Sequence, residues 1–142
     1  MLPRSTAEIA AVLRLCNAGG AVIIPHGGGT GVVAGKRSIA SVNAIILSLE
    51  RGNRVRASSV GDRAMAVEAG CFPGKVHLAA QGRGLMFPPG MAWKGRRTIG
   101  GNLATNAGGS QVTRQGSAIS ASESRRCGEG FCGLHRMSLR MS

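Results

Sequence analysis

The chain has 142 residues, enough for one domain with one hydrophobic core, and its apolar share of 43% excludes general disorder. Its net charge of +12 raises the question of nucleic acid, but the basic residues stand singly or in pairs without stacking aromatic residues, which argues against that class. No stretch approaches the ~20 apolar residues of a membrane span. The start of the chain lacks an apolar signal core, and the four cysteines form no secreted disulfide pattern, so we expect a cytoplasmic protein.

The first predicted element is a helix that begins after Ser5. The Ser5 hydroxyl and the Glu8 carboxylate form a capping box for the first turn. Gly19 and Gly20 end the helix, because glycine accepts the left-handed conformation found at helix C-termini. One apolar stripe with helical spacing is expected to face the core: Ile9, Val12, Leu13 and Cys16.

The remaining pattern predicts strands and helices in mixed order. Strands are expected over 21–24, 44–49 and 64–69, a helix over 73–80, and loops around 83–97. This order predicts an α+β domain without internal repeats.

A glycine-rich loop, residues 27–31, follows the first predicted strand directly. Successive glycines let backbone N–H groups converge on a phosphate, and the Thr30 hydroxyl adds a donor. The dinucleotide pattern G-x-G-x-x-G fails at Val32, and the P-loop pattern fails because Arg37 stands where Ser or Thr is needed. The loop alone therefore leaves a plain flexible loop open as an alternative.

A second glycine-rich segment covers residues 98–109. Two glycine pairs, Gly100–Gly101 and Gly108–Gly109, bracket a helical turn that contains Asn102, Thr105 and Asn106. A flat ligand between the two segments would meet backbone on both sides.

Both segments resemble a known family. Residues 25–35 (P-H-G-G-G-T-G-V-V-A-G) and 98–109 (T-I-G-G-N-L-A-T-N-A-G-G) are similar to the FAD-linked oxidase family, the vanillyl-alcohol oxidase superfamily. Within it, the chain resembles the branch of glycolate oxidase and of D-lactate and D-2-hydroxyglutarate dehydrogenases. Residues 47–51 and 67–71 (V-E-A-G-C) fit the same pattern, and the resemblance spans residues 1–116.

The resemblance implies a PCMH-type FAD-binding domain, of which this chain supplies the first lobe. It implies an FAD-dependent oxidoreductase that moves a hydride from the α-carbon of a small 2-hydroxy acid to the flavin. His26 does not match the histidine that some relatives link to flavin, so non-covalent FAD is expected. The residues implied to contact FAD are Gly27, Gly28, Gly29, Thr30, Gly31, Pro88, Thr98, Gly101, Asn102, Thr105, Asn106 and Gly109.

The chain also departs from the family. The segment Gly95-Arg96-Arg97 is more basic than usual, and the match stops after Gly116. The family's catalytic residues and substrate domain would follow that point, so no catalytic residue is assigned and the chain is expected to be a truncated, inactive fragment. Apolar residues such as Ile46 and Val67 are then expected to lack their packing partners.

The domain boundary is accordingly predicted at residue 116, with a partial FAD-binding domain over 1–116. Residues 117–142 lose the apolar pattern and are expected to be a frame-shifted or disordered tail without a role in folding. Cys127, Cys132 and His135 offer three zinc ligands there, but the spacing is not that of a zinc finger and no metal site is predicted. A non-catalytic module that binds FAD or another anion stays open as an alternative, and a basic nucleic-acid-binding protein is less favoured.

Overall fold

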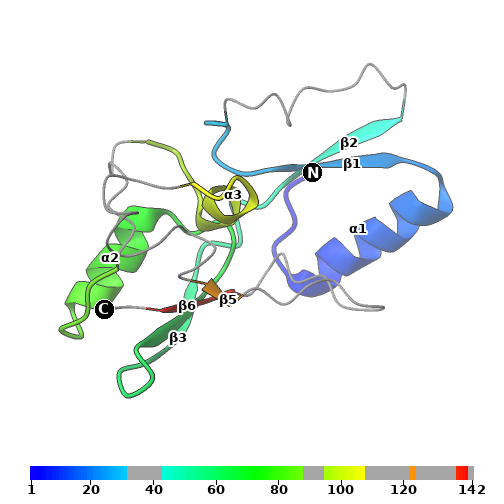
Figure 1. The fold of residues 1–142 in the computed structure, drawn as a ribbon. Coiled ribbons are helices and arrows are strands. Elements are labelled where there is room, and N and C mark those ends of the chain that lie inside the picture. The colour runs from blue at the N-terminus through cyan, green and yellow to red at the C-terminus, as the bar shows by residue number, and fades with distance from the viewer. Residues whose placement is uncertain (32–42, 88–94, 108–121, 124–136, 141–142) are drawn as a thin grey trace.

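The computed structural model describes residues 1–31, 43–87, 95–107, 122–123 and 137–140. Figure 1 shows α3 between the pair of strands β1 and β2 and the helix α2. The helices and strands are α1 (Thr6–Ala18), β1 (Val22–His26), β2 (Ala44–Ser48), β3 (Val55–Ser59), β4 (Ala64–Val67), α2 (Pro73–Gln81), α3 (Ile99–Ala104), β5 (Ser122–Glu123) and β6 (Met137–Arg140).

The predicted start and end of α1 are confirmed. Ser5 Oγ accepts a hydrogen bond from the Glu8 N–H at 3.2 Å, as an N-cap does. The Glu8 carboxylate reaches back, but it accepts from the N–H of Arg4 at 2.8 Å rather than from that of Ser5. At the other end Gly20 adopts the left-handed conformation with φ +65°.

The strands form two sheets. β1 and β2 pair in parallel, with Val22 opposite Ala44 and His26 opposite Ser48. The second sheet has the order β3-β4-β6-β5 and all its pairs are antiparallel. β3 is not among the strands expected from sequence, because Arg56, Ser58 and Ser59 give it no apolar alternation. Its pairing with β4 across a tight hairpin, and not its composition, makes it a strand.

Residues 122–123 and 137–140 lie in the tail for which no regular structure was expected. Here the structure differs from the expectation, because β6 pairs with β4. Arg140 lies opposite Ala64, and Met137 lies opposite Val67. Backbone pairing needs no apolar pattern in the added strand, so composition did not reveal it. The zinc-ligand candidates Cys127, Cys132 and His135 lie outside the described residues, and the boundary at residue 116 stays a prediction.

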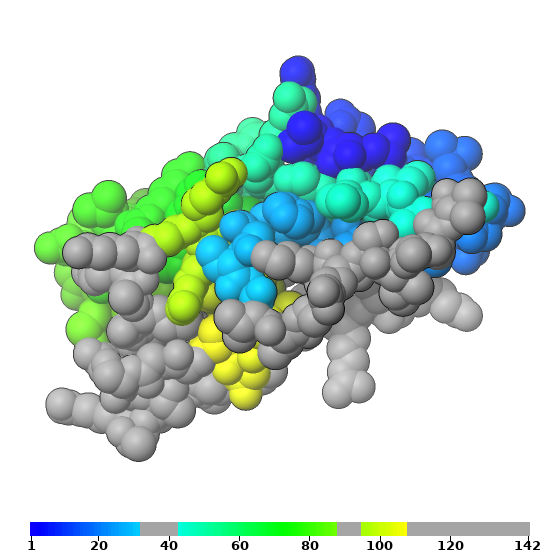
Figure 2. Space-filling model, turned by 90° about the horizontal axis from the view of Figure 1, so that it is seen from above, coloured from blue at the N-terminus to red at the C-terminus, as the bar shows by residue number. Residues whose placement is uncertain are grey.

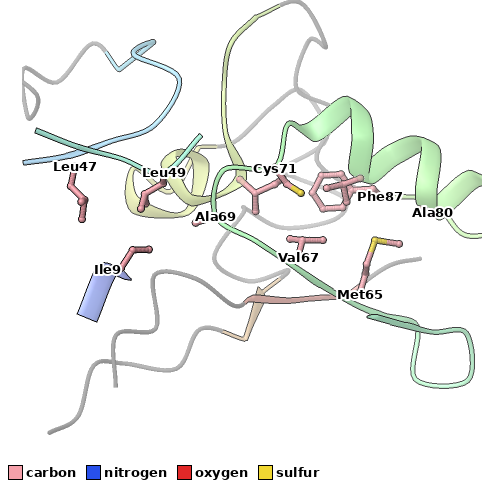
Figure 3. Packing of buried hydrophobic residues seen from close by; sticks show 11 residues of the cluster. Ile9, Leu47, Leu49, Met65, Val67, Ala69, Cys71, Ala80 and Phe87 are labelled. Atoms are coloured by element: carbon pink, nitrogen blue, oxygen red, sulfur yellow. The ribbon is translucent and has the colours of Figure 1, made fainter. Parts of the chain in front are cut away.

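One hydrophobic cluster joins α1, β2, β4, α2 and α3 (Figure 3). Val67 is fully buried in this cluster, so the expectation that it lacks packing partners is wrong. Ile46, in contrast, is 53% exposed, as expected. No helix within the described ranges is long and apolar enough to cross a membrane. The buried members of the cluster are Ile9, Leu47, Leu49, Met65, Val67, Ala69, Cys71, Val76, Ala80, Phe87 and Ile99.

The V-E-A-G segment, residues 67–70 at the end of β4, bonds to neighbouring parts of the chain. The Glu68 carboxylate is 1% exposed and accepts from the Arg54 N–H at 2.9 Å and from Arg56 Nε at 2.8 Å. Because these donors satisfy both carboxylate oxygens, the buried charge is compensated and holds β3 against the end of β4. Gly70 donates its N–H to Gly52 O at 2.8 Å, and a Cβ at Gly70 would overlap Leu49 O. The motif therefore has a structural role at this junction.

Candidate functional site

The two glycine-rich segments predicted to form a site lie against each other. A Cβ built on Gly27 would come within 2.5 Å of Thr98 Oγ1, and one built on Gly28 would overlap the carbonyl oxygen of Arg96. Figure 2 shows the end of the first segment, in blue, beside the second segment, in yellow and yellow-green. The absence of side chains at these two glycines is therefore required by contact between the segments.

The first segment presents backbone donors that the protein does not use. Within the described part of the chain, the N–H groups of Gly27, Gly28, Thr30 and Gly31 donate to no protein acceptor. Gly29 has φ +72°, a left-handed conformation that turns the chain and that glycine adopts without strain. Consecutive amides around such a turn form a concave site for an anion.

The second segment differs, because its helix start is already occupied. Ile99 N–H donates to Cys71 O and Gly100 N–H to Ala69 O, both at 2.8 Å. Gly101 N–H donates to the Thr98 hydroxyl at 3.3 Å. The amides of Ile99, Gly100 and Gly101 at the start of α3 are therefore not available to a phosphate. Whether a ligand meets backbone on both sides stays a prediction, because Gly108 and Gly109 lie outside the described residues.

Asn102 offers the second segment's one orphaned polar group in the described residues. The residue is buried, with an exposed fraction of 6%, and its Nδ2 has no hydrogen-bond partner among the described residues. Leaving a buried donor unpaired costs about 1–3 kcal/mol, so a bound acceptor at this position would be stabilising. Acceptor atoms abound in a flavin nucleotide, and this donor fits such a ligand.

The other predicted residues lie at the end of α3 or outside the described ranges. Thr105 donates its hydroxyl to Gly101 O at 2.9 Å, and Asn106 adopts a left-handed φ of +47° after the helix. Both residues are exposed. Pro88 and Gly109 are outside the described residues, so their assignment stays a prediction.

The charges around the first segment are positive. Arg96 and Arg97 are exposed next to Gly28, and among the described residues neither forms a salt bridge. The sequence analysis treated this pair only as a departure from the family. Its position beside the free amides favours a doubly charged anion such as a diphosphate.

The thiol of Cys71, the residue whose carbonyl accepts from the Ile99 N–H, does not act as a nucleophile. Cys71 is fully buried, and this burial raises the pKa of its thiol, partly offset by the charge of Lys75 and by a hydrogen bond from the backbone. A buried thiol with a raised pKa stays protonated and unreactive. Its carbonyl, rather than its sulfur, serves the site by accepting from Ile99.

These features define an α+β domain with a glycine loop suited to the diphosphate of a nucleotide cofactor. Comparison with known families gives the particular class: residues 1–124 match the family described as "FAD binding domain". The chain belongs to this family of FAD-binding domains. The predicted fold and the predicted cofactor, FAD, are thereby confirmed.

Individual relatives and a solved structure are also similar to this chain. The chain is 43% identical over 115 residues to a D-2-hydroxyglutarate dehydrogenase of Xanthomonas citri pv. viticola, which covers 81% of this chain and 24% of the relative. It is 34% identical over 112 residues to a D-lactate dehydrogenase of Anaerostipes hadrus, covering 79% and 23%. The fold matches a solved structure of alkyldihydroxyacetonephosphate synthase with TM-score 0.85 and 19% identity, over 99% of this chain and 30% of that one. The chain thus spans about a quarter of the length of the curated relatives it matches.

Proposed function

We propose that this chain is the diphosphate-holding part of an FAD-dependent dehydrogenase that oxidises a small D-2-hydroxy acid. The observation that carries the proposal is a set of amides, at Gly27, Gly28, Thr30 and Gly31, that donate to no acceptor in the described part of the chain. They lie beside Arg96 and Arg97, which form no salt bridge with any described residue. The names of the relatives support the reaction class and the substrate class. The bound flavin would supply the hydride acceptor.

Each residue of the proposed site has a defined task. The four amides would donate to the diphosphate oxygens, and hydrogen bonds to a charged acceptor contribute about 1.5–3 kcal/mol each. Asn102 Nδ2 would donate to an acceptor of the cofactor, and the exposed Thr105 and Asn106 would lie along it. We further propose that FAD is bound non-covalently and that the protein is cytoplasmic.

Gly31 offers the sharpest test of the diphosphate loop. A Cβ at Gly28 would collide with Arg96 and disturb the fold, whereas a Cβ at Gly31 meets no described atom within 4 Å. Gly31→Val therefore obstructs the ligand without a clash with the described chain. We expect the Kd for FAD, measured by quenching of flavin fluorescence, to rise on the order of tenfold to a hundredfold, the equivalent of about one lost charged hydrogen bond.

Gly61→Val is the matched control, because Gly61 also has open space around it and lies in the β3–β4 hairpin. It should leave FAD affinity unchanged. Equal affinities for wild type, Gly31→Val and Gly61→Val would contradict the assignment of the loop.

A module that binds FAD without catalysis is the second candidate. It stays open because no residue of this chain is assigned a catalytic role. Reconstitution of the printed chain with FAD, followed by dye reduction with D-2-hydroxyglutarate, D-lactate and glycolate, separates the two. We expect bound flavin without turnover for this chain alone. Sustained substrate-dependent dye reduction would show that it contains a complete active site.

A further inference from the structure

The side chain of Thr98 contacts both glycine-rich segments through a single atom, Oγ1. Its Oγ1 accepts the Gly101 N–H at 3.3 Å and so caps the start of α3. The same Oγ1 lies 2.5 Å from the position that a Cβ on Gly27 would take. The residue is 3% exposed, so water does not compete for this contact.

The backbone on either side of Thr98 extends the contact. Thr98 O accepts from the Asn102 backbone N–H at 2.9 Å. The residue that carries the unpaired Nδ2 is therefore bonded to Thr98 as well. Arg96 O lies where a side chain of Gly28 would be. The amides of Gly27 and Gly28 therefore take their position from residues 96–98.

We propose that Thr98 is a positioning residue of the FAD site, which fixes the amides of the first segment relative to the Asn102 side chain of α3. The proposal rests on the proposed function and deepens it. Thr98 does not need to touch the cofactor, because one hydroxyl caps the helix and packs on the loop. Displacing that hydroxyl would move donors on both segments relative to each other.

A simple helix cap would affect stability alone, so the test needs a cap of the same chemistry elsewhere. Ser5 provides it: its Oγ accepts from the N–H of Glu8, three residues on, as Thr98 Oγ1 accepts from that of Gly101. Ser5 starts α1 and contacts neither glycine-rich segment in any described hydrogen bond. Ser5→Ala is therefore the control for cap loss.

The first experiment measures the Kd for FAD of the whole 142-residue chain at a temperature where each variant is folded by circular dichroism. Thr98→Val keeps the shape of the side chain and removes the acceptor. We expect a loss of FAD affinity on the order of tenfold, because donors on the two segments would move relative to each other. Thr98→Ser keeps Oγ1 and should bind as wild type does. Ser5→Ala should lower the melting temperature without changing the Kd. Wild-type affinity in Thr98→Val would overturn the proposal, as would an equal loss in Ser5→Ala.

The second experiment tests the contact with Gly27 by a double-mutant cycle on the melting temperature. G27A should lower it strongly, because the new Cβ meets Thr98 Oγ1, while in the T98A background the nearest remaining side-chain atom would be Cβ at 3.7 Å. We therefore expect G27A to have little further effect in that background. Additive effects would show that Thr98 and Gly27 are not coupled. If the wild-type chain binds no FAD, the proposed function fails, while this cycle still decides the coupling.

Discussion

Residues 27–31 after β1 and residues 98–107 around α3 are both glycine-rich, yet their amides have different partners. Those of Gly27, Gly28, Thr30 and Gly31 donate to no acceptor in the described chain, whereas Ile99, Gly100 and Gly101 donate to Cys71, Ala69 and Thr98. Within the described residues, the first segment thus leaves these four donors open, whereas the second segment uses its amides to attach α3 to the core.

The comparison also separates glycines within one segment. Gly27 and Gly28 face residues 96–98, Gly29 makes the turn, and Gly31 faces open space among the described atoms. Similar glycines thus serve chain packing and backbone conformation, and we propose that Gly31 serves the approach of a ligand.

Gly28→Ala should have the largest effect. Its Cβ would overlap the backbone of Arg96, which cannot rotate away as a side chain would. We expect a loss of about 3 kcal/mol or more in the free energy of unfolding, measured by urea denaturation. Gly61→Ala is the control with open surroundings. An unchanged urea midpoint for Gly28→Ala would show that the two segments do not pack directly.

Gly100→Ala should have an intermediate effect. Its Cβ would come within 2.9 Å of Ala69 Cβ and 3.1 Å of Ala69 O, so α3 would have to move off the core. We expect a loss of about 1–3 kcal/mol in unfolding free energy. Gly101→Ala meets only Thr98 Oγ1, at 3.2 Å, and should be milder. Equal effects of the two substitutions would contradict the attachment of α3 through Gly100.

The double substitution Arg96→Gln and Arg97→Gln should leave stability nearly unchanged, because both side chains are exposed. If the pair flanks the diphosphate, FAD affinity should fall a few-fold at low salt and depend less on salt than in wild type. The measurement is the Kd for FAD between low and high ionic strength. If the Kd for FAD depends on salt equally in wild type and variant, the two arginines do not flank the bound diphosphate.

Alkaline pH should weaken the attachment of α3 through Cys71. Burial raises the pKa of this thiol, so the folded state favours the protonated form. Stability is then fully present below the ordinary thiol pKa and is lost as pH rises through the raised value. Urea denaturation from pH 7 to pH 10 should show this loss in wild type and less of it in Cys71→Ala. The same alkaline loss in both proteins would assign it to another group.

Several elements were predictable from sequence because their signals are local. The cap of α1 needs only Ser5 and Glu8 a turn apart, and the glycine pair after Ala18 needs only its own conformational freedom. β3 and β6 were not predictable, because pairing with β4 and not their composition makes them strands. The buried role of Glu68 was not predictable either, since one donor, Arg54, directly precedes β3 and the other, Arg56, lies on β3.

The class of this protein, an α+β domain with two glycine-rich segments of the FAD-binding family, is readable from its residues alone. Whether a glycine meets the chain, as Gly27 and Gly28 do, or leaves space, as Gly31 does, depends on how distant residues fold around it. This is because glycine is defined by an absent side chain. A missing Cβ looks the same in sequence whether protein backbone or a ligand fills its place, and only the positions of distant residues such as Arg96 and Thr98 distinguish the two.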